Sequence, residues 1–421
     1  FMTVTIYEVI GKMEEEITKY STFDDGLRAH FDALARGGYF KIVLKPLSRV
    51  KRCLHDAYRV ILFSLIVMYN VQHVIRAVLV RHSTDEIVDT LFILLTTLST
   101  LGKEAAFNLR SHRMENILNI INGPYFSASK AYHITVLKAS AVLMKRLLYL
   151  SHASVIICAS LWAIFPVVNR ALGQPVPFTA YFPFDTMETP AFQWTLAYMS
   201  ILIMFQAYGN VTMDATIVAL YAQAQVQIQI LRYNLEQLVN FNETKINTML
   251  ITRSNKHTYI DRDDTKEKDI LEQRLKNCIV HYQKILGFTE EIQTIFAEAM
   301  VFQFIVSAWV ICMTTYKIVG LNILSAEFFS MALYLLCMMG ELFIYCYIGT
   351  QLKVESEYIT QSIYCCEWLS LTPRFRRQLL LMMTFCGRPV APRIAYIIPM
   401  SLETYIVVLK SSYTLFTFLN R

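Results

Sequence analysis

The feature that most constrains this chain is the grouping of its apolar residues into runs of about 20 residues, separated by charged segments. Apolar residues make up 55% of the chain and charged residues 17%, below the roughly 25% charged residues of a soluble domain. A helix rises about 1.5 Å per residue, so a run of this length crosses a hydrocarbon layer of roughly 30 Å. The pattern predicts a polytopic membrane protein rather than a soluble protein with one buried core.

Seven runs are long enough to span a bilayer. They cover residues 57–80, 87–109, 147–168, 192–222, 295–319, 326–352 and 394–419. Lipid offers no hydrogen-bond partner to an open backbone, so each run is expected to be a helix. The predicted fold class is therefore an all-α membrane protein with seven transmembrane helices.

Lys and Arg are unevenly distributed between the segments that connect these spans. They crowd before the first span and in the second, fourth and sixth connections, whereas the other connections hold little beyond Arg81, Arg170 and Lys317. Basic residues stay in the cytoplasm, so the N-terminus is predicted inside and the C-terminus outside. A G-protein-coupled receptor has the opposite orientation, and its Asp-Arg-Tyr and Asn-Pro-x-x-Tyr motifs are absent from the third and seventh spans. This alternative is disfavoured.

Apolar residues continue at helical spacing beyond the fourth and fifth spans, which predicts cytoplasmic helical extensions over about residues 223–290. The extensions carry Val226, Ile230, Leu231, Leu235, Leu238, Leu271, Leu275, Ile279 and Ile285. The polar stretch 253–268 is predicted to be a loop. These apolar stripes either pack within one subunit or join several subunits below the membrane, and we favour the second interpretation.

The chain is predicted to divide into three parts. Residues 1–352 form a six-helix bundle with its cytoplasmic extensions, residues 353–393 an amphipathic cytoplasmic anchor, and residues 394–421 a final helix. Within the anchor, Tyr358, Trp368 and Leu371 are the candidate contacts with other subunits.

The final span is unusual because small hydroxyls recur along one side of it. At about 100° per residue, one face collects Val407, Ser411, Thr414, Phe418 and Arg421, with Glu403 and Lys410 at its edge. The opposite face holds Tyr405, Leu409, Ser412 and Phe416. Hydroxyls closed by one large ring suit a pore wall with an apolar gate. For Phe418 the alternative is packing against lipid or a neighbouring helix.

Lys410 is an ionisable residue within this last span. Such a side chain in mid-bilayer is unfavourable by roughly 3 kcal/mol, so it is expected to face water or a partner.

Specific motifs are confined to the C-terminal fifth of the chain. They are Tyr347 to Ser356, Trp368, Arg377, Ser401 to Tyr413 and the Thr414-Leu-Phe tail. With these motifs the chain resembles the insect odorant receptors. The resemblance implies a seven-helix subunit of a tetrameric cation channel in the cell membrane of olfactory neurons, gated by a small volatile odorant. It also implies assembly with co-receptor subunits as a heterotetramer, because the short connection between the fourth and fifth spans is that of a tuned, odorant-binding subunit.

The related gustatory receptors are the main alternative. Thr404-Tyr405 matches their C-terminal pattern, but Ser411-Ser412 stand where those receptors have Gln-Phe. The resemblance to odorant receptors places Phe418 at the apolar constriction of the pore. Four copies of Lys410 and Arg421 would repel cations whereas one copy would not, which leads to the hypothesis that this subunit functions in heteromers.

The resemblance also places the odorant site in the outer half of the bundle, among the second, third, fourth and sixth spans. The candidate residues there are Val88, Phe92, Leu95, Val155, Cys158, Trp162, Tyr198, Leu202, Phe329 and Tyr334. Ordinary helix packing is the alternative for each of them. Asp214, Glu298 and Glu341 are acids within spans that either line an ion route or are structural groups.

Motifs of other function classes are absent from the sequence. There is no His-Glu-x-x-His, phosphate-binding loop or nucleotide-binding glycine pattern, and Cys365-Cys366 lacks the spacing of a zinc site. A transporter would show inverted repeats. We therefore expect no catalytic residues, no metal, no cofactor and no nucleic-acid partner.

Overall fold

Long helices dominate the fold, as the apolar runs require. The computed structural model describes residues 21–41, 48–82, 84–171, 173, 178–186, 188–239, 263–320, 326–394 and 397–419. The elements are the π-helical turn η1 (Thr22–Leu27), α2 (Arg28–Arg36), α3 (Arg49–Leu79), α4 (Thr84–Leu109), α5 (Ser111–Ile121), α6 (Ala131–Ala171), α7 (Ala191–Glu236), α9 (Asp263–Gly320), α10 (Ala326–Cys365), the 3₁₀ turn η2 (Trp368–Ser370), α11 (Pro373–Cys386), β1 (Arg393–Ile394), β2 (Ile398–Pro399) and α12 (Leu402–Leu419).

Five helices in the described part of the chain are long and apolar enough to cross a membrane: α3, α6, α7, α9 and α10. They contain the first and the third to sixth predicted spans. The second predicted span coincides with α4, which carries Asp89, Lys103 and Glu104 and is not among the five. The predicted boundary at residue 352 falls inside α10, which continues to Cys365.

The predicted seventh span begins too early. Residues before Leu402 form a short hairpin, in which β1 pairs antiparallel with β2. Pro399 lacks a backbone N–H and keeps the residue before it out of the helical region. Helix α12 therefore begins only after Ser401, whose Oγ accepts a hydrogen bond from the Thr404 amide at 3.4 Å as a helix N-cap does.

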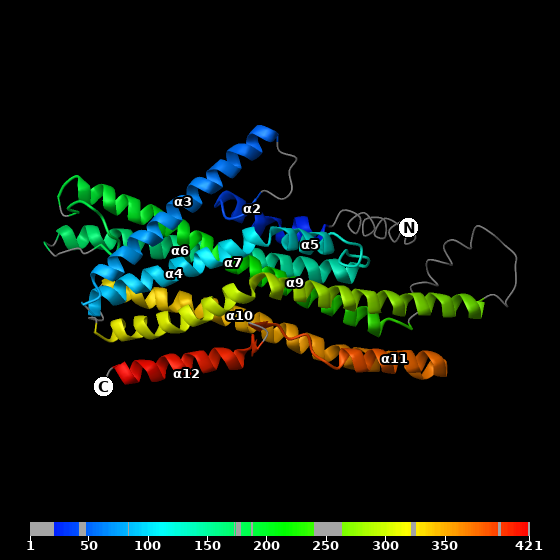
Figure 1. The fold of residues 1–421 in the computed structure, drawn as a ribbon. Coiled ribbons are helices and arrows are strands. Elements are labelled where there is room, and N and C mark those ends of the chain that lie inside the picture. Colours follow the sequence, from blue (N-terminus) through cyan, green and yellow to red (C-terminus); the bar gives the residue numbers. More distant parts are fainter. Residues whose placement is uncertain are drawn as a thin grey trace, which may run out of the picture.

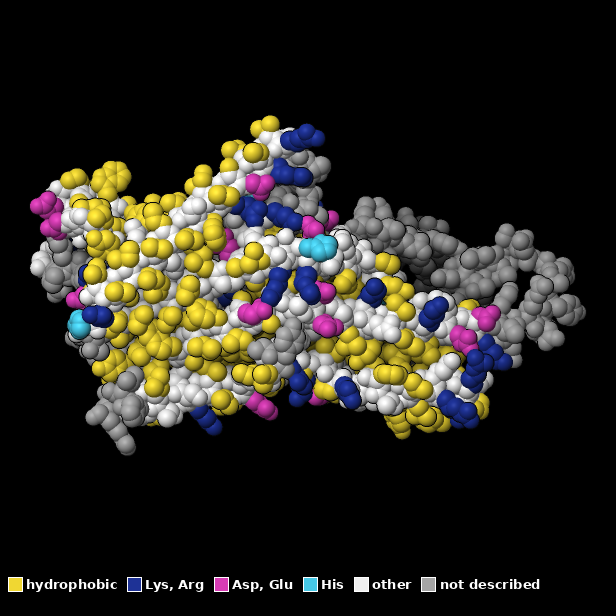
Figure 2. Space-filling view, viewed as in Figure 1, with side chains coloured by type: hydrophobic (Ala, Val, Ile, Leu, Met, Phe, Trp, Pro, Cys, Tyr) yellow, Lys and Arg dark blue, Asp and Glu magenta, His cyan; other side chains and the backbone are white. Residues whose placement is uncertain are grey.

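Most helices run along one long axis, while α3 crosses the bundle obliquely (Figure 1). The α3–α4 turn, the end of α9 and the end of α12 gather at one end of the molecule, and α5, α11 and the start of α9 lie toward the other (Figure 1). On the face shown in Figure 2, hydrophobic side chains cover the part that holds the α3–α4 turn and the end of α12, on the left. Most Lys and Arg of this face lie in the middle and toward α11, on the right. The long helices expose large apolar side chains, such as Val60 and Ile61 on α3 and Ile156 and Ile157 on α6, which suits contact with lipid.

The extensions of α7 and α9 beyond the predicted spans pack against each other within the single chain. Leu231, Leu235, Leu275 and Ile285 are buried, and only Ile279 of the predicted stripe is exposed. This surface is already covered in one subunit, so the interpretation that these stripes join subunits is wrong. Helix α9 begins at Asp263, so residues 263–268 of the predicted loop are helical. The rest of that loop, 253–262, lies outside the described residues.

Residues of the motif from Tyr347 to Ser356 on α10 contact the segment that precedes α12. A Cβ at Gly349 would lie 2.1 Å from the carbonyl oxygen of Met400, so only glycine allows this approach. Thr350 Oγ1 accepts a hydrogen bond from the Leu402 amide at 3.0 Å, and Ser356 Oγ accepts one from the Val390 amide at 2.8 Å. The sequence motif is thus a structural link between α10 and α12.

Candidate functional site

A cavity of about 360 Å³ lies inside the helix bundle. Its walls come from α4, α6, α7 and α10, and Gln303 and Val306 of α9 complete it. Most lining side chains are apolar, such as Ile93, Val155 and Ile203. A cavity of this size and character suits a small apolar ligand held by few polar groups.

Three aromatic side chains from three helices form one wall of the cavity. The rings of Phe92 on α4 and Trp162 on α6 are stacked at 6.2 Å, and Tyr334 on α10 lies 4.9 Å from Phe92. Next to this wall, the sulfur atoms of Cys158 and Cys337 are 4.0 Å apart. Aromatic faces of this kind supply a large apolar contact area for a ligand.

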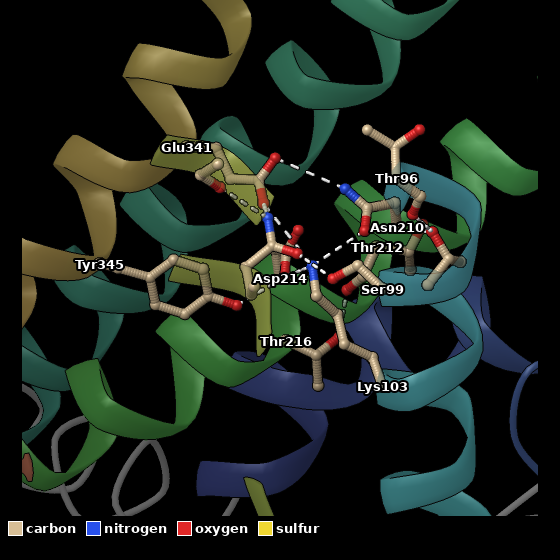
Figure 3. Close-up of polar contacts among 12 residues, drawn as sticks. Thr96, Ser99, Lys103, Asn210, Thr212, Asp214, Thr216, Glu341 and Tyr345 are labelled. Atoms are coloured by element: carbon tan, nitrogen blue, oxygen red, sulfur yellow. Dashed lines mark hydrogen bonds and ion pairs between the residues drawn. The ribbon is translucent and has the colours of Figure 1, made fainter. Parts of the chain in front are cut away.

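The polar lining residues Asn210, Asp214, Glu341 and Tyr345 belong to a network around Lys103, which lies beside the cavity (Figure 3). Its ammonium nitrogen lies 2.5 Å from Asp214 Oδ1, 2.8 Å from Asn210 Oδ1 and 3.6 Å from Glu341 Oε1. The hydroxyl of Tyr345 donates to the same Asp214 oxygen at 2.6 Å. Both partners in the Lys103–Asp214 pair are buried.

Gln303 extends this network to α9. Its Nε2 donates to Glu341, and its Oε1 accepts a hydrogen bond from Ser99 at 2.5 Å. A buried charge is tolerated only when it is paired and hydrogen-bonded. Lys103, Asp214 Oδ1 and Glu341 meet both conditions, while Asp214 Oδ2 has no partner within the described residues. Asp214 and Glu341 are therefore structural groups at the polar part of the cavity, which we call the cavity floor. Glu298 pairs with Arg110 at the surface.

Half of the sequence-predicted ligand residues line the cavity. Those that line it are Phe92, Val155, Cys158, Trp162 and Tyr334. The others do not: Val88 and Leu95 on α4 and buried Leu202 lie outside the lining, Tyr198 donates to Gln72 at 2.9 Å, and Phe329 is exposed. The sequence identified the helices that surround the cavity. It did not show which side of each helix faces the cavity, and this rotation determines which side chains line it.

Several lining residues were missed by the sequence analysis. Gln206 and Asn210 were not named, and Asp214 was named only as an acid of undecided role. The three recur at every fourth position of α7, so they form a polar stripe on one face of a span. Lys103 was missed as the cation of the network. The spacing of these polar residues within apolar runs was the available signal, since ionisable side chains within a span are expected to face partners or a cavity.

Within the described residues, helix α12 packs against α9 and α10 through one side. Ser412 Oγ donates to the Ala308 carbonyl of α9 at 3.0 Å, and the ring of Tyr405 lies 5.7 Å from Phe343 of α10. The predicted pore face points away: Val407, Lys410, Ser411 and Thr414 are exposed. The side chain of Phe418 and the whole of Arg421 lie outside what the structure describes.

The predicted anchor residues occupy different environments. Leu371 is buried in its own subunit and Trp368 is partly buried, whereas Tyr358 is exposed with the guanidinium of Arg232 5.0 Å from its ring. The large exposed apolar side chains nearby were not foreseen from sequence. They are Tyr364, Leu369, Leu380, Leu381 and Phe385.

Comparison with known proteins agrees with this architecture. A family model described as 7tm Odorant receptor matches residues 83–413. Odorant receptor Or1 of Anopheles gambiae is 22% identical over 336 residues, 78% of this chain and 80% of its own length. Odorant receptor 46a, isoform B, of Drosophila melanogaster is 24% identical over 371 residues, 86% of this chain and 88% of its own length.

A solved structure shares the fold at lower sequence identity. The insect olfactory receptor OR5 from Machilis hrabei in complex with eugenol superimposes with a TM-score of 0.78 at 15% identity, over 93% of this chain and 96% of that chain. The family model covers well over half of the residues, and the two curated relatives extend the match across most of the chain. The chain therefore belongs to the 7tm odorant receptor family and is an insect odorant receptor.

Proposed function

We propose that this chain is an odorant-binding subunit of a ligand-gated cation channel. A small volatile ligand binds in the cavity between α4, α6, α7 and α10, and α12 lines a pore that is shared with co-receptor subunits. The N-terminus is cytoplasmic and the C-terminus extracellular, as the distribution of Lys and Arg favours. The membrane is that of an olfactory sensory neuron.

The observation that carries this proposal is that one helix, α10, contacts both the cavity and α12. Tyr334, Met338 and Glu341 line the cavity. Farther along α10, Phe343 contacts Tyr405 and Thr350 accepts the hydrogen bond from Leu402. A ligand that binds more tightly to one position of α10 therefore biases the position of α12, and only this difference in affinity gates the pore.

The exposed face of α12 supports its pore role. Val407, Ser411 and Thr414 are exposed whereas Ser412 packs against α9, so the first three are available to a neighbouring subunit or a water-filled pore. Lys410 is exposed at the edge of this face. Four copies of this lysine around one axis would repel cations, which favours a heteromer in which co-receptor subunits supply the other pore helices.

The surface that holds the subunits together is proposed to be α11 and its neighbours. Leu380, Leu381 and Phe385 are exposed on α11, with Tyr364 and Leu369 before it. An exposed apolar patch of this kind marks a protein interface. Tyr358 and Trp368 lie in the same segment of the chain and are proposed to take part, while Leu371 supports the segment from inside.

Whole-cell recording with and without the co-receptor tests the proposal directly. Cells that lack G-protein signalling are used, and odorants are applied from a broad panel. We expect a rapid cation current when both subunits are present and little or no current from this subunit alone. Surface labelling controls for expression in both conditions.

Two results would contradict the proposal. A response that depends on G proteins would assign a receptor without its own pore. A large cation current from this chain alone would show that Lys410 does not prevent a homomeric pore.

A further inference from the structure

One amide side chain in the cavity has no hydrogen-bond partner at either of its polar atoms within the described residues. Gln206 of α7 lines the cavity and is 3% exposed. Neither its Nε2 nor its Oε1 has a hydrogen-bond partner within the described residues. A buried amide in this condition is unfavourable unless something else in the cavity pairs with it.

Most of the other polar groups of the cavity are satisfied within the chain. The Ser and Thr hydroxyls that line it each donate to a main-chain carbonyl of their own helix: Thr96, Thr97, Thr100, Ser151 and Ser154. Asn210, Gln303 and Tyr345 take part in the network around Lys103. These hydrogen bonds do not require a ligand. Asp214 keeps one oxygen, Oδ2, without a partner although its Oδ1 is paired, whereas neither polar atom of Gln206 is paired within the described residues.

The charges at the cavity floor also limit the ligand. Lys103 is the cation that contacts the carboxylates of both Asp214 and Glu341, so two acids share one ammonium group. An anionic ligand would lose its hydration and meet this excess of acidic groups. Most of the lining is apolar, so the cavity favours a molecule with a largely apolar body that contacts Phe92, Trp162 and Tyr334.

We propose that Gln206 is the specificity-determining residue of the ligand site and selects neutral alcohols or phenols over ethers and hydrocarbons of the same size. This proposal rests on the proposed function of the cavity as an odorant site. A hydroxyl carries one donor and two acceptor lone pairs. It can therefore donate a hydrogen bond to Oε1 of the amide and accept one from Nε2. An ether offers only an acceptor, and a hydrocarbon offers neither. A site built to bind a hydroxyl discriminates strongly against an analogue that lacks it.

Matched probes test this selectivity without knowledge of the natural ligand. The panel pairs isomeric alcohols and ethers, from 1-octanol with 1-methoxyheptane to 2-phenylethanol with benzyl methyl ether. The full-length receptor is expressed with co-receptor. Each probe is measured by evoked current and by thermal stabilisation of the purified complex. The parent receptor is expected to prefer the alcohol of the best-bound pair by about tenfold or more.

Two variants remove the amide while keeping its size, Gln206→Leu and Gln206→Met. Both are expected to fold, because they replace an unpaired polar group by an apolar one. Both should bring the preference for alcohol over ether to within about twofold, since the apolar side chain no longer distinguishes the probes. The matched control is Thr195→Val, which removes an unpartnered buried hydroxyl on the same helix outside the cavity lining. It should leave the preference unchanged.

The outcomes separate this inference from the proposed function. A parent receptor that binds both members of each pair equally, or a Gln206 variant that keeps the preference, overturns the inference and means that Gln206 is paired with bound water. A preference seen in thermal stabilisation without any current supports the inference and contradicts the channel function. The absence of binding and current for every probe contradicts both.

Discussion

The ammonium nitrogen of Lys103 on α4 lies 2.5 Å from the carboxylate of Asp214 on α7, and the pair is buried beside the ligand cavity. The same nitrogen is 3.6 Å from Glu341 on α10. One cation thus joins three helices whose sequence positions are far apart. Breaking such a buried pair leaves an uncompensated charge, so this contact holds the inner part of the bundle together.

The substitution Lys103→Met should destabilise the receptor by about 3–5 kcal/mol, because Asp214 and Glu341 lose their cation. The measurement is thermal unfolding of the purified receptor together with its surface expression. Adding Asp214→Asn should restore part of the stability. The substitution Lys41→Met, which breaks an exposed pair with Glu115, serves as the control and should have little effect. Unchanged stability of Lys103→Met would mean that the network does not depend on ion pairing.

The substitution Trp162→Ala should enlarge the cavity at its aromatic wall. We expect the best ligand to shift to a longer homologue and the affinity for the original ligand to fall, by roughly 1–3 kcal/mol for each methylene of mismatch. Dose–response curves for a homologous series of alcohols measure this shift. Trp194→Ala changes an exposed tryptophan outside the cavity lining and should not alter the series. An unchanged optimum in Trp162→Ala would remove this residue from the site.

Cysteines placed on neighbouring positions of α12 should report its two faces. Ser411→Cys and Thr414→Cys should react with a charged methanethiosulfonate reagent during channel opening and lose current, because their side chains face away from the bundle. Ser412→Cys is the matched control, since this residue is buried against α9, and it should resist modification. The reverse pattern of reactivity would place the pore on the other face.

The substitution Gly349→Ala should disturb the junction between α10 and α12. The added Cβ would lie 2.1 Å from a backbone oxygen of Met400, so the returning chain must move. Overpacking of this kind is unfavourable by about 1–3 kcal/mol, and we expect loss of current even where the protein reaches the surface. Gly287→Ala is the control, because nothing lies within 4 Å of its added Cβ. Normal currents from Gly349→Ala would show that this close contact does not position α12.

The stability of the α7 and α9 extensions should fall in acid because of His281. This residue lies outside the predicted spans, and its Nε2 is 3.0 Å from Gln227 Oε1. Burial, with a smaller contribution from His133, lowers the pKa of His281 from 6.5 to about 4. As the pH falls, His281 therefore becomes protonated in the unfolded chain at a higher pH than in the folded chain. The contribution of the neutral imidazole is complete above pH of about 6.5 and declines toward pH 4, by about 3 kcal/mol in total.

The substitution His281→Gln tests this dependence, because an amide keeps a donor for Gln227 but does not titrate. Chemical unfolding is measured between about pH 7 and pH 4 at constant ionic strength. The variant should show a smaller loss of stability over this range than the parent receptor. Equal slopes in the two proteins would mean that His281 is not protonated differently on unfolding.

Some features followed from residue patterns alone. Runs of apolar residues act locally, since each must be helical in lipid whatever its neighbours are, and five of the seven predicted spans lie in helices that are apolar enough to cross a membrane. The family resemblance followed from the motifs of the C-terminal fifth, from Tyr347 to the Thr414-Leu-Phe tail. The start of α12 was predicted wrongly because Pro399 and the hairpin before it were included in an apolar run.

The sequence by itself determined which segments are apolar helices, which connections between them carry Lys and Arg, and the family of the chain. These properties depend on residues that are close together in the sequence. Only the tertiary structure decided which side of each helix lines the cavity. It brought Lys103, Asp214 and Glu341 together from three helices, and it left Gln206 unpaired within the described residues. The rotation of a helix about its own axis depends on the shapes of all the helices packed against it, and no single stretch of sequence contains that information.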